Sequence, residues 1–329
     1  MKRWTIEEEN LVKKHYEKSK KDLLLSLLPN RSWTGIKIRG KQFNLKRDYT
    51  YSKDESFFES PNLNNCWVSG FIAGDGFLID CNGYKSLGIE LSNKDMDILE
   101  KIKELTKYTG VITSRTRNYK IKNYRKTGLL EYAGTSKMAS LKFCSADKYH
   151  DDLFKNWNLI PNKVKRLEPP NLTDLKLILS FISGNICADG NIDYHYNQVK
   201  NAKSLVITFL GTEQFLEWIK TETNKIFKDP LESYVRKERQ GANVFCYRIS
   251  SIKSYIISKM ILSLDIYHME RKWGKARDFI KMVESCNVST RFLSRLRRAL
   301  TPEIIDFVKG TPQEFPPDFL NKIGYFSKT

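Results

Sequence analysis

Residues 66–80 read CWVSGFIAGDGFLID, and residues 180–193 read SFISGNICADGNID, so the chain contains an internal repeat. Gly70 aligns with Gly184 and Asp75 aligns with Asp189, and each pair is separated by 114 residues. Downstream, SLGIELSNKDMDILEKIKEL matches SLVITFLGTEQFLEWIKTET, and SLKFCSADKYHDDLFKNWNLIP matches CYRISSIKSYIISKMILSLDIY. Each matched stretch has the pattern of a strand followed by a helix. The sequence therefore predicts two tandem repeats, each ordered helix, strand pair, helix, strand pair, helix.

Small residues recur one turn apart on the first helix of each repeat, as Gly70 and Gly74 and then as Gly184 and Ala188. Such faces allow two helices to pack with their backbones unusually close. Because an aspartate follows directly at each helix end, this packing would bring Asp75 and Asp189 together at the end of the contact.

The ends of these two helices should carry an excess of negative charge. A glycine follows each aspartate, as Gly76 and Gly190, and predicts a left-handed cap. A carboxylate at a helix C-terminus is disfavoured by the helix dipole, and two adjacent carboxylates repel, so a cation should compensate. Mg²⁺, held by carboxylate oxygens and substrate phosphates, fits that need. A single such motif is usually only a helix stop, but two copies with the same acid position favour a site.

The stretches VSGFIAGDG (residues 68–76) and ISGNICADG (residues 182–190) resemble the LAGLIDADG motif, whose eighth position is the acid. Over about residues 65–283 the chain resembles a single-chain, two-repeat LAGLIDADG homing endonuclease. It departs from the motif where Asn185 stands at an apolar position, which we expect to loosen the helix interface. Ala73 and Cys187 also replace the acid at the sixth position.

This resemblance implies an α+β fold in which two αββαββα repeats form a pseudo-symmetric sheet saddle over DNA. It also implies that Asp75 and Asp189 bind Mg²⁺, with Mn²⁺ able to substitute, together with the backbone carbonyls of Gly74 and Ala188. Such an enzyme hydrolyses one phosphodiester in each strand across the minor groove of a long, non-palindromic target, leaving short 3′ overhangs. An RNA-splicing maturase and a catalytically silent DNA-binding regulator of the same fold are the alternatives. The two retained aspartates argue against the regulator and only weakly against a bifunctional maturase.

A basic residue beside each metal would stabilise the charged transition state. The segment LIPNKVKRLEPP resembles the family's I-P-x-K stretch and nominates Lys163, with Lys165 as the alternate. The segment DIYHMERKWGK occupies the same place in the second repeat and nominates Lys272, with Arg271 as the alternate. An ordinary solvated lysine after a proline turn is the competing interpretation.

Candidate strands at 111–117, 119–126 and 231–239 combine basic residues with tyrosines. A two-stranded ribbon fits the DNA major groove, where arginine contacts with guanine are the commonest specific contacts. Which residues would contact phosphates instead of bases is left open. The candidate DNA-binding residues of these strands are Arg115, Arg117, Lys120, Lys122, Arg125, Arg236, Lys237 and Arg239.

Residues 1–50 predict a separate unit of three short helices. Thr5–Glu8 and Ser19–Asp22 are capping-box-like starts, and Ser32 can cap a third helix. One face of that helix carries Trp33, Ile36, Gly40 and Phe43. The unit resembles Myb/SANT-like helix-turn-helix domains, in which the last helix enters the major groove. Lys37, Arg39 and Lys41 are then the candidate DNA contacts, whereas a small bundle with a solvated basic face is the alternative.

The whole chain has 329 residues, a formal net charge of +18 and 40% hydrophobic residues, which is typical of a folded protein that neutralises a polyanion. Residues 1–53 hold 14 basic and 6 acidic side chains, a large share of that charge. Six scattered cysteines and four isolated histidines indicate neither a zinc site nor a disulfide framework. Glycine-rich phosphate loops are absent, so we expect no nucleotide cofactor.

The remaining expectations concern organisation and location. Residues 51–64 predict a linker, residues 65–170 and 171–283 the two repeats, and residues 284–329 a helical C-terminal extension. Since both repeats lie in one chain, we expect a functional monomer whose partner is double-stranded DNA. Its longest apolar stretch is too short to span a membrane, and acids stand where a signal peptide needs an apolar run. We therefore expect a soluble, intracellular protein of a prokaryotic or phage-infected host, or of an organelle.

Overall fold

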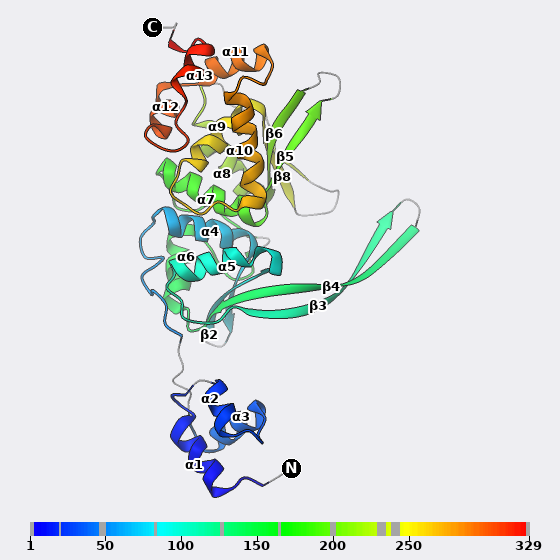
Figure 1. Ribbon diagram of the computed structural model, residues 1–329, viewed down its shortest axis with the longest axis vertical. Helices are drawn as coiled ribbons and strands as arrows, with labels where there is room; N and C mark the ends of the chain where they lie inside the picture. Colours follow the sequence, from blue (N-terminus) through cyan, green and yellow to red (C-terminus); the bar gives the residue numbers. More distant parts are fainter. Residues whose placement is uncertain are drawn as a thin grey trace. The chain divides into compact units, whose positions relative to one another are not determined.

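The computed structural model of the chain describes residues 3–19, 21–45, 51–81, 84–125, 128–163, 166–197, 202–228, 235–237 and 244–326 (Figure 1). Side chains are described in these ranges except at 121–125, 128–132, 197 and 202. The chain divides into two compact units, Met1–Lys53 and Asp54–Thr329.

The first unit contains helices α1 (Ile6–His15), α2 (Lys21–Leu27) and α3 (Trp33–Gln42). Thr5 and Glu8 form the predicted capping box at the start of α1, and Ser32 caps α3 by accepting a hydrogen bond from the Gly35 amide. The unit has its own small hydrophobic core, formed by Val12, Tyr16, Leu24, Leu28 and Ile36. Trp33 on α3 and Phe43, its C-cap residue, pack against this core, which agrees with the face predicted from their spacing.

The second unit contains the two predicted repeats, and their element order is confirmed. The first repeat consists of α4 (Leu63–Asp75), β1 (Gly76–Cys81), β2 (Tyr84–Ser92), the 3₁₀ turn η1 (Asn93–Asp95), α5 (Met96–Leu105), β3 (Thr113–Arg125), β4 (Gly128–Phe143) and α6 (Asp147–Trp157). The second consists of α7 (Leu175–Ala188), β5 (Asn191–Asn197), β6 (Ala202–Gly211), α8 (Glu213–Asn224), β7 (Arg236–Lys237), β8 (Phe245–Ser250) and α9 (Ser251–Leu262). The fold is therefore α+β.

Each repeat builds one antiparallel four-stranded sheet, with strand orders β1-β2-β4-β3 and β5-β6-β8-β7. The apolar face of each sheet is covered by the helices of its repeat (Figure 1). Ile89 on β2 and Leu141 on β4 pair on this face of the first sheet, and Ile207 and Ile249 do so in the second. All four side chains are fully buried. The opposite face of each sheet, which these helices do not cover, is called the outer face below.

The prediction of separate strands at 111–117 and 119–126 was wrong. Residues Thr113–Arg125 form one strand, β3, which pairs without interruption with β4. The result is a long ribbon that extends away from the body of the unit (Figure 1). The predicted boundary at Asn118 does not exist, because Asn118 pairs with Thr135 within the continuous ladder. In the ribbon, Tyr119 simply lies opposite Gly134.

Helices α4 and α7 lie side by side at the centre of the unit (Figure 1). A Cβ atom added to Gly70 would lie 1.9 Å from the carbonyl oxygen of Phe181, and one added to Gly184 would lie 1.9 Å from that of Trp67. Since Trp67 and Phe181 occupy equivalent positions in the two repeats, the contact is reciprocal. The close backbone approach predicted from the small residues is confirmed.

The predicted left-handed caps at Gly76 and Gly190 are wrong. Gly76 has φ −78° and ψ 158°, which is extended backbone, and Gly190 is not among the described residues with positive φ. These glycines instead allow a direct passage from helix to strand. A Cβ on Gly76 would lie 2.7 Å from Ile72 Cα, and one on Gly190 would lie 2.6 Å from Ile186 Cα. At both Gly76 and Gly190 a side chain is excluded by contact with the preceding helix turn and not by the backbone φ angle.

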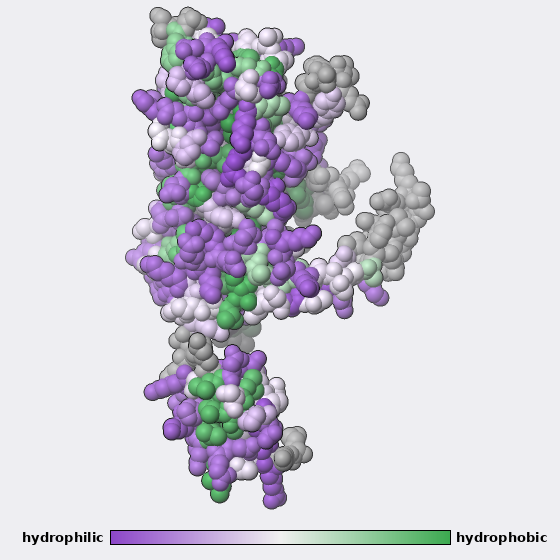
Figure 2. Space-filling model, in the orientation of Figure 1, coloured by the Kyte–Doolittle hydropathy of each residue, from purple (hydrophilic) through white to green (hydrophobic). Residues whose placement is uncertain are grey.

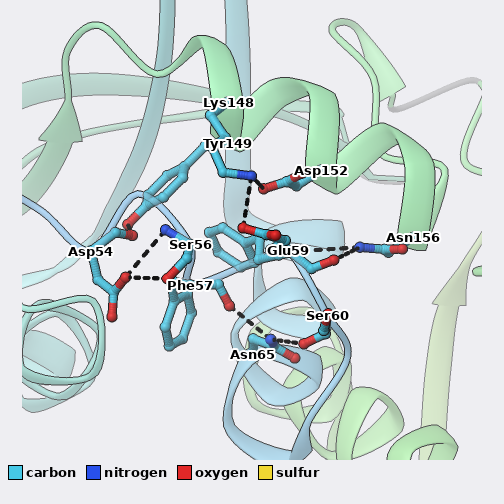
Figure 3. A network of polar contacts seen from close by, with 11 residues as sticks. Asp54, Ser56, Phe57, Glu59, Ser60, Asn65, Lys148, Tyr149, Asp152 and Asn156 are labelled. Carbon is cyan, nitrogen blue, oxygen red and sulfur yellow. Dashed lines mark hydrogen bonds and ion pairs between the residues drawn. The ribbon is translucent and has the colours of Figure 1, made fainter.

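Part of the segment expected to be a linker, residues 54–62, packs on the first repeat (Figure 3). Phe58 is fully buried there. The Asn65 side chain donates hydrogen bonds to the carbonyls of Phe57 and Ser60, at 2.7 and 2.8 Å, and that of Asn156 donates to the Phe58 carbonyl at 3.0 Å. The boundary between the units therefore falls between Lys53 and Asp54.

The C-terminal part contains α10 (Glu270–Glu284), α11 (Thr290–Ala299), α12 (Pro302–Val308) and α13 (Pro317–Lys322). A buried ion pair fixes it to the second repeat. Lys259 on α9 is 1% exposed and lies 2.5 Å from the Glu284 carboxylate, and its ammonium also lies 4.6 Å from the ring centre of Phe315. Removing one partner would leave a buried charge unpaired. The extension is thus an integral part of the second unit.

Hydrophilic residues dominate the face of the second unit in the space-filling view (Figure 2). Within the described ranges, none of the helices has the length and apolar character that crossing a membrane requires.

Substituting Gly70 should severely destabilise the second unit, because an added methyl group would overlap the Phe181 carbonyl. We expect Gly70→Ala to lower the free energy of unfolding by about 3 kcal/mol or more. Chemical denaturation monitored by circular dichroism measures this change. Ser69→Ala on the same helix is the matched control. The buried Ser69 hydroxyl has no partner among the described residues, so its removal should cost little. Equal losses in the two variants would contradict the proposed backbone contact.

Candidate active site

The two repeated aspartates lie at the ends of the central helices. Asp75 is the last residue of α4, and Asp189 is the C-cap of α7. A Cβ atom placed on Gly74 would lie 3.1 Å from Asp189 Oδ2, so the second carboxylate lies directly against the end of the first helix. The environments of the two aspartates differ, because Asp75 is half-buried and Asp189 is exposed.

The pKa of Asp75 is raised to about 6, mainly by burial and then by the negative charge of Asp189. The ammonium groups of Lys272 and Lys163 act in the opposite direction and compensate only in part. The carboxylate therefore lies in an environment where its charge is incompletely balanced. A bound cation would stabilise the ionised form of the Asp75 carboxylate.

Both predicted lysines are buried beside the helix ends. Lys163 is 7% exposed and its Nζ donates a hydrogen bond to the Gly74 carbonyl at 2.7 Å. Lys272 is 8% exposed and its Nζ lies 2.7–2.9 Å from four carbonyl oxygens, those of Ile186, Cys187, Ala188 and Gly190. Burial lowers the pKa of each lysine. The structure thus places an ammonium group of each nominated lysine at the negative end of a helix dipole, and it adds the backbone carbonyls that these groups contact.

The alternates to these lysines are not in the same position. Arg271 forms an ion pair with Asp95 of the first repeat, with 3.1 Å between Nη2 and Oδ2, while Lys165 lies outside the described residues. The segment that carries Lys163 is fixed in a related way, because the Leu167 carbonyl accepts a hydrogen bond from Thr212 at 2.7 Å. Each lysine-bearing segment is therefore held by the opposite repeat.

A cavity of about 250 Å³ adjoins Asp189, and its lining also includes Gly74, Lys163 and Asn185. Asn185 is 1% exposed, and its Oδ1 atom has no hydrogen-bond partner among the described residues. The repeat alignment places the apolar Phe71 at the equivalent position of the first repeat. The departure noted at Asn185 thus makes the two halves of the site chemically different.

The donor atoms at this site suit a hard divalent cation. The two carboxylates are oxygen ligands of the kind that Mg²⁺ prefers. The carbonyls of Gly74 and Ala188 accept hydrogen bonds from Lys163 and Lys272, so each would offer an ion only its second lone pair. In the part of the chain that the structure describes, no group of three or more His, Cys, Asp or Glu side chains could hold a metal alone. A cation here would need further ligands, which water or a substrate phosphate can supply.

The basic residues of the β3–β4 ribbon divide between its two faces. Because pairing with β4 is uninterrupted, Arg115 and Arg117 lie on one face and Lys120 on the other. Arg115 forms an ion pair with Glu90 at 2.6 Å, on the sheet face opposite the helices. Arg117 is exposed. The backbones of Lys122 and Arg125 belong to β3, but their side chains lie outside the described part.

Two further basic residues were missed by sequence reasoning. Lys142 on β4 pairs with Gly88, and Arg248 on β8 pairs with Thr208, so the two occupy equivalent positions on the outer faces of the two sheets. Both are exposed. Alternation with the buried Phe143 and Ile249 could have indicated them.

The predicted strand at 231–239 is described only in part. Arg236 and Lys237 form β7, are exposed, and pair with Cys246 and Phe245 of β8. As neighbours on a strand they face opposite sides of the sheet. Arg239 lies outside the described residues.

In the first unit, the three candidate contacts of α3 also differ. Lys37 and Lys41 are exposed and lie one turn apart on one face. Arg39 instead forms an ion pair with Glu9 of α1 and lies 4.9 Å from the ring centre of Phe43. Arg39 therefore joins α1 to α3, and the two lysines are the more accessible cations.

Comparison with protein-family models and with curated proteins finds no match. Among solved structures, the chain is similar to the LAGLIDADG homing endonuclease I-GzeII in complex with its DNA target, with 13% identity, 72% of this chain and 96% of that chain covered, and a TM-score of 0.45. The LAGLIDADG meganuclease I-AabMI bound to uncleaved DNA shows 14% identity, coverage of 71% and 97%, and a TM-score of 0.43. The I-LtrWI LAGLIDADG homing endonuclease bound to target DNA shows 9% identity, coverage of 79% of this chain and 99% of that chain, and a TM-score of 0.43. Likenesses at this level leave the case for a function to the residues of the site.

The raised pKa of Asp75 should make stability depend on pH. The folded state holds this proton up to about pH 6, whereas the ordinary value is 3.8. Its contribution to stability is therefore complete below the ordinary value and is lost as the pH rises through 6. In the absence of divalent ions, lowering the pH from 7.5 to 5 should stabilise the wild type relative to Asp75→Asn by about 1 kcal/mol.

Urea denaturation at the two pH values measures this difference, and Asp80→Asn, at an exposed position of β1, is the control. The assignment fails if Asp75→Asn and the wild type show the same change between the two pH values.

Proposed function

We propose that the chain is a site-specific endonuclease that hydrolyses one phosphodiester in each strand of double-stranded DNA. The observation that carries the proposal is the position of Asp75 and Asp189 at the ends of two helices in backbone contact, with a buried lysine beside each end. Paired carboxylates with incompletely balanced charge are suited to hold divalent ions against a phosphate. The resemblance of both helices to the LAGLIDADG motif points to the same activity.

Asp75 and Asp189 would hold Mg²⁺, or Mn²⁺ in its place, with the carbonyls of Gly74 and Ala188 as further ligands. When bound, the ions would lower the pKa of the attacking water and offset the charge on the leaving 3′ oxygen. Lys163 and Lys272 hold the helix ends in place through the hydrogen bonds to their carbonyls. Their ammonium charges would also favour the extra negative charge of the transition state.

DNA would lie across the outer faces of the two sheets, opposite the helices. Arg115, Arg117 and Arg236 lie on these faces, and Lys142 and Arg248 join them because of their positions there. Lys120 and Lys237 alternate to the other face, so they are not among the contacts proposed for the outer faces. Lys122, Arg125 and Arg239 stay proposed contacts from the sequence. Two fused but different repeats suit a long, non-palindromic target cut across the minor groove with short 3′ overhangs. Since one chain supplies both aspartates and both sheets, we propose that it acts as a monomer.

Selection of cleaved sites from a randomised duplex library in Mg²⁺ tests the activity and yields the target. On that target, Asp75→Asn and Asp189→Asn should each slow double-strand cleavage by roughly a thousandfold, while affinity measured in Ca²⁺ is retained. Asp80→Asn should cut like the wild type, because Asp80 lies outside the site.

Wild-type cutting rates in either aspartate variant would rule out the metal assignment. Specific DNA binding without cleavage by the wild type would favour the silent regulator, and splicing activity on a bound RNA would favour the maturase.

We also propose that the first unit is a Myb/SANT-like DNA-binding domain whose α3 enters the major groove. Its separate core and the exposed Lys37 and Lys41 support this role. Such a unit would add affinity through effective concentration and leave the chemistry unchanged.

Deleting residues 1–53 should therefore preserve the cleaved phosphodiesters, weaken binding and shorten the footprint on one side. The salt dependence of binding should become shallower by about one for each lost phosphate contact. Footprinting and a salt titration measure both effects, and Lys37→Gln with Lys41→Gln in the full chain should reproduce part of the change. An unchanged footprint and slope would point to a protein partner for this unit.

A further inference from the structure

Helix α11 carries a basic face that the proposed site does not use. Its sequence, TRFLSRLRRA, contains four arginines and no acidic residue. Arg291, Arg295 and Arg298 are exposed and lie at positions i, i+4 and i+7, which share one helix face. We refer to these three residues as the α11 arginine stripe. Arg297 is turned further inward and is half-buried.

The opposite face of α11 is fixed to the body of the unit. Leu296 is fully buried, and the ring of Phe292 packs edge-on against that of Phe279 on α10, with 6.2 Å between the ring centres. A helix that inserts into a membrane surface needs a free apolar face. Because this face is already buried, the surface that α11 offers to a partner is the arginine stripe.

No residue of the stripe forms an ion pair with a carboxylate in the part of the chain that the structure describes. Other arginines of this unit do, as Arg271 does with Asp95 and Arg277 with Glu270. Like charges four residues apart on a helix repel. The stripe is therefore a concentrated positive surface that an external anion would stabilise, and arginine is well suited to phosphate.

The position of α11 relates the stripe to the second sheet. A chain of ring contacts runs from Phe292 through Phe279 to Tyr194 on β5, the edge strand of that sheet. Helix α10 is joined to the same strand, because Tyr194 donates a hydrogen bond to the Lys275 carbonyl at 2.9 Å. Helix α11 lies next to α10, at the end of the second unit where the chain terminus labelled C is drawn (Figure 1).

We propose that the α11 arginine stripe binds the phosphate backbone of duplex DNA that flanks the target on the side of the second repeat. Arg291 and Arg298 are about 10 Å apart along the helix, and three successive phosphates of one strand cover two base-pair steps, or about 7 Å of rise, a difference that long arginine side chains can bridge. The spacing thus suits successive phosphates of one strand. This inference rests on the proposed DNA binding, and it assigns the stripe a share of the affinity that does not depend on base sequence.

The test compares the full-length wild type with the triple variant Arg291→Gln, Arg295→Gln, Arg298→Gln. The control removes the same charge from exposed lysines of the C-terminal part, as Lys281→Gln, Lys309→Gln, Lys322→Gln. Binding to a 40-base-pair duplex of arbitrary sequence is measured by fluorescence anisotropy in Ca²⁺ over a range of salt concentrations. Thermal melting verifies that each variant is folded.

For the stripe variant we expect affinity to fall on the order of tenfold in low salt, and the slope of log K against log salt to become shallower by about 2 to 3. The control should change both quantities much less. Equal losses of affinity in the two variants would mean that the stripe acts only through the net charge of the protein, and this would overturn the proposal. Unchanged DNA affinity of the stripe variant would overturn it as well. Preferential loss of binding to a duplex RNA of the same length would overturn the assignment to DNA. If the wild type itself does not bind the DNA duplex, the proposed function fails before the stripe is tested.

Discussion

Everything in the second unit is arranged around the contact between α4 and α7, where the backbone of each helix fills the space that a side chain would occupy on the other. Gly70 against the Phe181 carbonyl and Gly184 against the Trp67 carbonyl are the two halves of this contact. It sets the distance between the two repeats, because each helix continues directly into the first strand of its own sheet. The same contact brings two helix ends, each with its aspartate, to one place.

That arrangement concentrates negative charge, and the structure balances it from within. Lys163 and Lys272 are buried at the carbonyls of the helix ends, and each lies on a segment that the opposite repeat holds in position. The balance is incomplete, because Asp75 keeps a raised pKa despite both ammonium groups. The helix ends and carboxylates that the two lysines neutralise in part are thus the same charges that the proposed cation would meet.

The symmetry of the repeats weakens away from this centre. Asn185, which lines the cavity beside Asp189, stands where the first repeat has Phe71. The second repeat alone continues into α10–α13, which the Lys259–Glu284 pair joins to α9. The first repeat alone follows a small helical unit with its own core. The two repeats therefore share a symmetric core and differ in the segments that precede the first and follow the second along the chain.

The sequence alone determined the repeat, the order of its helices and strands, the small-residue contact and the alignment of Asp75 with Asp189, because periodicity and spacing are local properties of a chain. It also nominated Lys163 and Lys272, although it could not state what they touch: Lys272 meets the Ala188 carbonyl across 84 residues of sequence. Only the tertiary structure decided that Arg39 and Arg115 are engaged in ion pairs, that Lys142 and Arg248 share the outer sheet faces, and that Gly76 and Gly190 adopt no left-handed cap. In each case the deciding partner is distant in sequence or the local pattern admits more than one backbone conformation, so burial and contact had to resolve what residue type left open.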